Sequence, residues 1–166
     1  YGSVDTMKIV IKDNTLKGDI DLTRPYRAIQ LYGRNMTTTL EHRYQRVYEV
    51  RNNVIQGGGA IRLDGHSDDA DNTIINVLDN EVYNSREKAL EVNYAKSGRI
   101  SGNTFRGMWK GYNDYTNGDS DAGLYLSYST IDLVSNVIDS SNGIGLRYIS
   151  NYGRIDSNTV SNNGTG

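Results

Sequence analysis

Two carboxylates, Asp64 and Glu91, are the residues of this chain whose type and position best suit acid–base chemistry. Carboxylates a few ångströms apart can act as acid and nucleophile on a glycosidic bond, and a wider separation leaves room for water and inversion. Arg62 would hold Glu91 ionised, which leaves Asp64 as the acid. Under this hypothesis, Glu91→Gln abolishes turnover and leaves binding and folding largely intact. In the alternative interpretation, Glu91 only pairs with Arg62 on a solvated surface.

A lyase is a second interpretation of the same region. Arg62, Lys88 and His66 could take part in it, because such an enzyme needs a base that removes the proton beside a uronate carboxylate. No lyase motif is legible in the sequence, so this hypothesis rests on the residue types alone.

Two acidic runs, 64–71 and 117–123, carry clustered side-chain oxygens. Such clusters on a loop can bind Ca²⁺, and in the second run Asp119 and Asp121 would be the ligands. This run resembles the start of an EF-hand loop, but Ala122 replaces the glycine and no terminal Glu follows. Solvated polar loops are the alternative, and no other cofactor is expected.

Aromatic residues gather between positions 109 and 125, where Trp109, Tyr112, Tyr115 and Tyr125 stand. An exposed aromatic ring offers a flat apolar face with a polar handle, which suits stacking on a sugar ring. In the alternative interpretation, the rings pack down on the fold and pin a loop.

These candidates depend on a repeated motif that must position them. The motif is an apolar residue, two residues, Asn, one residue and a second apolar residue, as in VLDNEV at 77–82. It occurs six times, and the spacings between successive asparagines are 39, 27, 23, 33 and 22 residues. A minimum near 22 with variable insertions is typical of one solenoid coil plus its loops. The motif asparagines are Asn14, Asn53, Asn80, Asn103, Asn136 and Asn158.

The motif predicts an all-β fold, a right-handed parallel β-helix of about six coils. Inward aliphatic side chains would form columns, because strand residues alternate between the two faces and coils stack at the strand spacing. Each Asn would sit at a bend, where it tolerates left-handed backbone. Its amide would bond to the Asn of the next coil, as in the side-chain ladders of stacked strands. A β-sandwich with Asn-rich turns is the alternative, but sandwich strands do not repeat one residue-level motif six times.

A second strand follows five of the six motifs, and each is preceded by Ala or Gly. Its outward residues would form columns up one outer face. The predicted columns are Gln30, Arg62, Glu91, Tyr125 and Gly145, and then Tyr32, Asp64, Asn93, Ser127 and Arg147. Arg62 and Glu91 are therefore expected to be neighbours, as are Asp64 and Asn93.

Two long insertions, at 17–27 and 106–122, project from the same corner of the predicted β-helix. They are about three coils apart along its axis. They would frame a trough of roughly 14 Å, from the strand spacing. The acid pair would lie on its floor. The predicted substrate-binding residues are Arg62, Asn93, Tyr125, Trp109 and Tyr112.

The motif resembles the right-handed parallel β-helix superfamily, which includes pectate lyases, polygalacturonases, alginate epimerases and phage tailspikes. The resemblance runs from Ile9 to Val160 and rests on scaffold positions. It implies a polysaccharide-binding and polysaccharide-degrading protein (glycosidase or lyase), tailspike-like and acting on a bacterial surface glycan. The Gly-Asp-Gly-x-Thr-Asp-Asp stretch of many tailspikes is absent. The alternative is a non-catalytic spacer or adhesin whose loops meet a receptor.

The whole chain, 1–166, is interpreted as one β-helix segment of a longer protein, with open strand edges at both ends. The net charge of −2 does not favour a nucleic-acid partner. No apolar run approaches the roughly 18 residues of a membrane span. With no Cys, disulfides and thiolate metal sites are excluded. The tailspike resemblance implies a homotrimer and an extracellular or virion-surface location.

Overall fold

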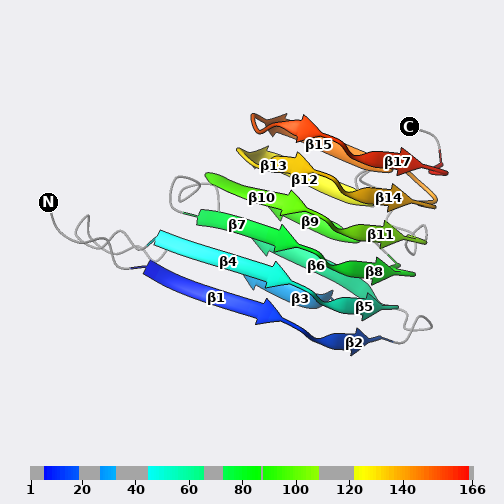
Figure 1. The fold of residues 1–166 in the computed structure, drawn as a ribbon, viewed down its shortest axis with the longest axis horizontal. Helices are drawn as coiled ribbons and strands as arrows, with labels where there is room; N and C mark the ends of the chain where they lie inside the picture. The colour runs from blue at the N-terminus through cyan, green and yellow to red at the C-terminus, as the bar shows by residue number, and fades with distance from the viewer. Residues whose placement is uncertain are drawn as a thin grey trace, which may run out of the picture.

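The computed structural model describes residues 6–18, 27–32, 45–65, 73–86, 88–108 and 122–164. Within these ranges the chain is all-β, with 17 strands and no helix. The strands form three sheets, A, B and C, of six, six and five strands, and neighbouring strands in each sheet are parallel. Figure 1 shows them stacked from β1 and β2 at one end to β15 and β17 at the other.

The three sheets take their strands from the chain in a fixed rotation. Sheet A contains β1 (Thr6–Lys12), β4 (Gln45–Arg51), β7 (Thr73–Leu78), β10 (Ser97–Ser101), β13 (Asp132–Val134) and β16 (Ile155–Asp156). Sheet B contains β2 (Thr15–Lys17), β5 (Val54–Gln56), β8 (Glu81–Tyr83), β11 (Thr104–Arg106), β14 (Val137–Asp139) and β17 (Thr159–Ser161). Sheet C contains β3 (Arg27–Tyr32), β6 (Gly59–Asp64), β9 (Leu90–Asn93), β12 (Leu124–Ser129) and β15 (Leu146–Asn151).

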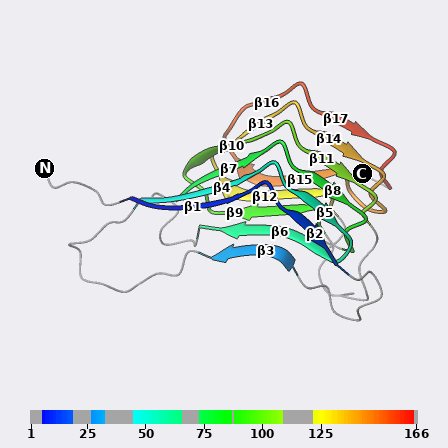
Figure 2. The ribbon, with the colours of Figure 1, turned by 60° about the horizontal axis from the view of Figure 1, so that its bottom comes forward.

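Each passage of the chain through A, B and C returns it to sheet A beside its previous strand, as β4 pairs with β1 and β7 with β4. Figure 2 shows the successive passages superposed around a common interior. Strands adjacent in a sheet are therefore one full passage apart in sequence. This arrangement of stacked parallel sheets is consistent with a parallel β-helix.

The interior is filled by columns of aliphatic side chains, because alternate strand residues point inward. In sheet A, Val50, Val77 and Ile100 lie in register on successive strands and are fully buried. Sheets B and C contribute similar columns. Their buried members include Ile55, Val82, Phe105, Ile138, Leu63, Val92 and Leu126. The repeated apolar residues of the sequence are thus the core of the fold.

The bend between sheets A and B depends on the residue before each motif Asn. These residues have positive φ: Asp13 59°, Asn52 53°, Asp79 53°, Gly102 69°, Ser135 55° and Ser157 55°. The expectation that the motif Asn itself is left-handed is wrong by one residue. Short polar residues and Gly tolerate this conformation best. The Asn that follows keeps an ordinary φ and turns its side chain into the interior, where Asn80 and Asn103 are fully buried.

The motif asparagines are joined by hydrogen bonds from one coil to the next. Each side-chain Nδ2 donates to the Oδ1 of the next Asn at 2.8–2.9 Å, from Asn14 to Asn158. The same Oδ1 accepts the backbone N–H of the preceding Asn, as Asn80 does for Asn53 at 3.0 Å. Each Nδ2 of the inner asparagines also donates to a carbonyl of the previous coil, such as Asn80 to Val50. The amides therefore satisfy backbone groups that the bend takes out of the sheets.

The register of the last sheet C strand differs from the predicted one. Leu146 pairs with Leu124 and Arg147 with Tyr125. Arg147 therefore takes the place predicted for Gly145, and Ile149 takes the place predicted for Arg147. The corner before this strand uses two more residues than expected, since Gly145 lies opposite Gly123. Ile144, Gly145 and Leu146 have the apolar–small–apolar pattern of a strand start, so the sequence placed the strand at Ile144. The strand begins two residues later, at Leu146.

We predict that Asn80→Ala lowers the free energy of unfolding by about 1–3 kcal/mol, because it leaves buried partners such as the Asn53 N–H and the Val50 carbonyl unsatisfied. Urea denaturation measures the change. The matched control is Asn142→Ala, at an exposed position, which should stay within about 0.5 kcal/mol. Equal losses in the two variants would contradict a structural role for the buried amides.

Candidate functional site

The outer face of sheet C brings the predicted acid pair together. Arg62 in β6 is in register with Glu91 in β9, and Asp64 is in register with Asn93. Both neighbour relations predicted from the repeat are present. Asp64 and Glu91 therefore lie on the same face, on adjacent strands and two positions apart along them.

Glu91 is nearly buried, although it stands on an outer face, and its side chain is 8% exposed. Three cations surround its carboxylate. Arg27 Nη1 lies 2.9 Å from Oε2, Lys88 Nζ lies 3.5 Å from Oε2, and Arg62 Nε lies 3.5 Å from Oε1. Asn93 Nδ2 donates a further hydrogen bond to Oε1 at 3.2 Å. Glu91 is thus the centre of an ion network that spans three coils.

Burial alone would raise the pKa of Glu91, because a desolvated carboxylate disfavours the charged form. The charges of Lys88, Arg62 and Arg27 outweigh this effect, so the pKa of Glu91 lies below its usual value. A general acid at neutral pH needs the opposite shift. Glu91 is therefore held as an anion, in agreement with the role given to Arg62 in the acid–base hypothesis.

Asp64 lies at the edge of this network, with a side chain that is 16% exposed. Its Oδ2 is 3.5 Å from Arg62 Nη2, so one guanidinium serves both carboxylates. Arg62 therefore links the two carboxylates of the predicted acid pair.

Asn93, predicted to bind substrate, uses both the nitrogen and the oxygen of its side-chain amide in hydrogen bonds within the protein. Its Nδ2 donates to Glu91, and its Oδ1 accepts from the Ser127 hydroxyl at 2.5 Å. Ser129 continues the chain, since its hydroxyl donates to the Ser127 carbonyl and accepts from Ala95 N–H. In the middle of the second outward column of sheet C, Asn93 and Ser127 are therefore buried and hydrogen-bonded to each other.

Two tyrosines frame the ion network. The Lys88 Nζ lies 4.5 Å from the ring centroid of Tyr125, and the Arg62 guanidinium lies 5.2 Å from that of Tyr32. Tyr125 is partly buried, and Tyr32 is 49% exposed. The polar network thus has aromatic rings at two of its borders, three coils apart.

Several predicted residues lie outside the described ranges. They are His66, Trp109, Tyr112, Tyr115, Asp119 and Asp121, together with most of the insertions that were to frame the trough. Among the residues that the structure does describe, no three His, Cys, Asp or Glu side chains are grouped so that they could hold a metal ion.

Arg27 is a site residue that sequence reasoning missed. It begins β3 and reaches Glu91 two coils away, which no local pattern indicates. Its signal was its place directly before Ala28, the small residue that marks the start of the second strand. Tyr94 and Tyr128 were also missed, and their rings stack at 5.3 Å between centroids with an interplanar angle of 7°.

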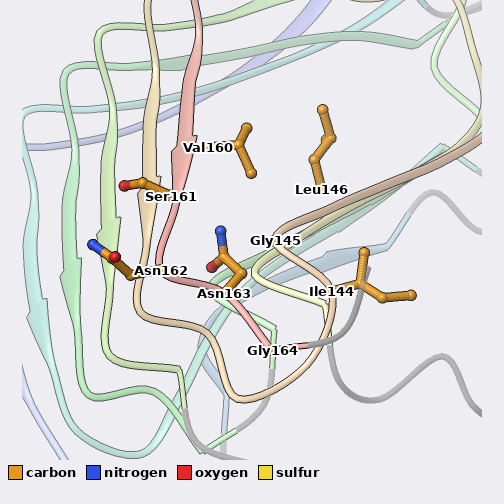
Figure 3. Close-up of a pocket in the computed structure, with 8 residues that line it drawn as sticks. All are labelled: Ile144, Gly145, Leu146, Val160, Ser161, Asn162, Asn163 and Gly164. Atoms are coloured by element: carbon orange, nitrogen blue, oxygen red, sulfur yellow. The ribbon is translucent and has the colours of Figure 1, made fainter.

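A hollow of about 340 Å³ lies elsewhere, at the end of the stack between the start of β15 and the end of β17. Figure 3 shows Leu146 and Val160 pointing into the space between these strands. The eight lining residues include no acidic or basic side chain. This hollow therefore offers neither an acid nor a base for the chemistry considered above.

No protein-family model and no curated protein matches the sequence, and no solved structure matches the fold. In the part of the chain that the structure describes, no helix is long or apolar enough to span a membrane.

In place of the largely intact folding expected from the sequence, the three cations around Glu91 predict that Glu91→Gln lowers the free energy of unfolding at pH 7 by about 3 kcal/mol, the scale for leaving partners of a buried ion pair uncompensated. Because the pKa of Glu91 is lowered in the folded state, its contribution is present above the unfolded value of about 4.5. It is lost as the pH falls through the folded value. The difference between wild type and variant should therefore begin to shrink as the pH falls below about 4.5 and approach zero once Glu91 is protonated in the folded state.

Urea titrations between pH 3 and 7 measure this convergence. Glu81→Gln, at an exposed position of sheet B, is the matched control and should stay within about 0.5 kcal/mol of wild type. A constant wild-type advantage at every pH would show that Glu91 contributes through the hydrogen-bond geometry of its carboxyl group rather than through its charge.

Proposed function

We propose that this chain is a right-handed parallel β-helix of about six coils that binds a polysaccharide along the outer face of sheet C, without cleaving it. The right hand is expected because strand–crossover–parallel-strand connections take it almost without exception. The asparagine ladder is proposed to hold the coils in register. The binding face is then a rigid surface rather than a set of loops.

The observation that carries the proposal is the ordered series of groups on this face. From β3 to β15 the central column reads Gln30, Arg62, Glu91, Tyr125 and Arg147. Four strand spacings cover roughly 19 Å, which is the length of a few sugar units. The network around Glu91 fixes the polar groups, and Tyr32 adds an exposed ring. Fixed polar groups beside aromatic faces are the usual means of orienting a polar ligand.

Binding without cleavage is favoured by the state of Glu91. Its carboxylate is nearly buried under three cations and has a lowered pKa. A glycosidase needs one carboxyl group that stays protonated at its working pH. Both oxygens of Glu91 are held by cations, so this carboxylate also lacks a free oxygen with which to attack a sugar ring.

Hydrolysis by Asp64 and Glu91 is the second candidate. It is favoured by one observation, namely that the two carboxylates lie on one face and on adjacent strands. That placement fits either spacing used by glycosidases. A homotrimer and an extracellular or virion-surface location, as the tailspike resemblance implies, stay predictions.

We predict that the protein is retained on at least one polymer in a panel of capsular, teichoic and uronate polysaccharides and does not shorten it. Tyr32→Ala should weaken retention about three- to tenfold, because an aromatic contact contributes about 0.5–1.5 kcal/mol. Tyr83→Ala, on the outer face of sheet B, is the matched control and should bind as wild type does.

Quantitative affinity electrophoresis measures retention, and viscometry measures chain length. Chain shortening that disappears in Asp64→Asn, at unchanged thermal stability, would replace the binding proposal by the hydrolytic one. Failure of every polymer to retain the wild-type protein would contradict both and leave the spacer interpretation.

A further inference from the structure

The left-handed positions of this fold follow a rule that two residues break. Eleven described residues other than Gly have a positive φ, and nine of them are Asp, Asn or Ser. The other two are Tyr94 and Tyr128, at 54° and 46°. Short polar residues enter this region because their side chains can hydrogen-bond locally. A bulky residue has no such compensation, so a left-handed Tyr is a genuine outlier.

The two tyrosines occupy one structural position on neighbouring coils. Tyr94 N–H donates to the Ser127 carbonyl, as Gly65 N–H donates to the Asn93 carbonyl one coil earlier. On the next coil, Ile149 and Asn151 pair with Ser127 and Ser129, which places Ser150 beside Tyr128. The column therefore reads Gly65, Tyr94, Tyr128 and Ser150.

Stacking does not account for the tyrosines by itself. The rings lie 5.3 Å apart and nearly parallel, but one stacked pair returns less free energy than two left-handed bulky residues lose. Tyr128 is also 53% exposed, so little of its ring is buried in return. Uncompensated backbone strain concentrates at functional sites. The pair therefore calls for a ligand rather than for a packing role.

Tyr94 covers one face of the Tyr128 ring, and the neighbour on the other side is Ser150, whose side chain is too short to cover a ring. Tyr128 immediately follows Ser127 of the second outward column of sheet C. The ring pair thus forms a platform at the edge of the face to which the proposed function assigns a polysaccharide.

We propose that the Tyr94–Tyr128 pair is a sugar-binding subsite, in which a pyranose ring stacks with its C–H face on the exposed ring of Tyr128. This inference rests on the proposed function and adds a specific contact to it. A pyranose suits the platform because its faces carry C–H bonds and its hydroxyls lie at its rim, where they keep their water. A flat ring with a polar tip serves such a half-wet contact.

Tyr128→Ser tests the subsite, because Ser is the residue that the same column carries at position 150. The probes are maltotriose, chitotriose and trigalacturonate, titrated calorimetrically into the wild-type protein and the variants. We expect the probe that binds to lose about tenfold in affinity in Tyr128→Ser and to keep its affinity in Tyr128→Phe. Tyr83→Ser on sheet B is the control and should bind as wild type does.

Thermal unfolding of the same variants separates a subsite from a packing role. Tyr128→Ser should leave the midpoint unchanged or raise it, because it relieves left-handed strain. Equal affinity of wild type and Tyr128→Ser, or a midpoint lowered by several degrees, would overturn the subsite while the proposed function stands. Binding of none of the probes, together with no retention on the polysaccharide panel, would overturn the proposed function and the subsite with it.

Discussion

The interaction on which this structure depends is the hydrogen bonding of the Asn side chains at the bend between sheets A and B. A chain that turns sharply within a parallel stack removes backbone groups from the sheet ladders, and buried groups of this kind must find other partners. The motif amides supply them, since Asn80 accepts from the Asn53 backbone and donates to the Val50 carbonyl. Their side chains also bond to one another between successive strands of the stack, as Asn53 Nδ2 does to Asn80 Oδ1. A one-residue slip would turn every inward side chain outward.

The ion network on sheet C follows from that register. Arg62 and Glu91 meet because β6 and β9 pair at these positions, and Arg27 reaches the same carboxylate from β3. A nearly buried carboxylate is costly unless several partners compensate it. Three cations and one amide do so here. The same three cations that stabilise the nearly buried carboxylate of Glu91 also lower its pKa, so one arrangement accounts for both the order of this face and the anionic state of Glu91.

Sequence reasoning recovered what the repeat dictates and failed where a residue departs from it. The motif indicated the all-β fold, the aliphatic columns and the neighbour relations of Arg62 with Glu91 and of Asp64 with Asn93. The register of β15 was misplaced because Ile144, Gly145 and Leu146 alternate like the true strand start. Arg27 was missed because its partner lies 64 residues away. The left-handed conformation was assigned to the motif Asn, because the motif Asn and the residue before it are both of types that tolerate this conformation.

The exceptions to a repeat carry more information about binding than the repeat itself. Every coil packs against the same interior, so the residue types at inward and bend positions are constrained. The residue types at outward positions are free to vary. Tyr94 and Tyr128 depart from the short polar residues found at the other left-handed positions. A bulky residue in this conformation costs about 1–2 kcal/mol. Their stacking returns about 0.5–1.5 kcal/mol for the pair. Two such residues therefore cost more than one stacked pair contributes. Sequences that specify one structure at every level break their local rules mainly at functional or strained positions, and these two tyrosines are such a break beside an otherwise ordered polar face.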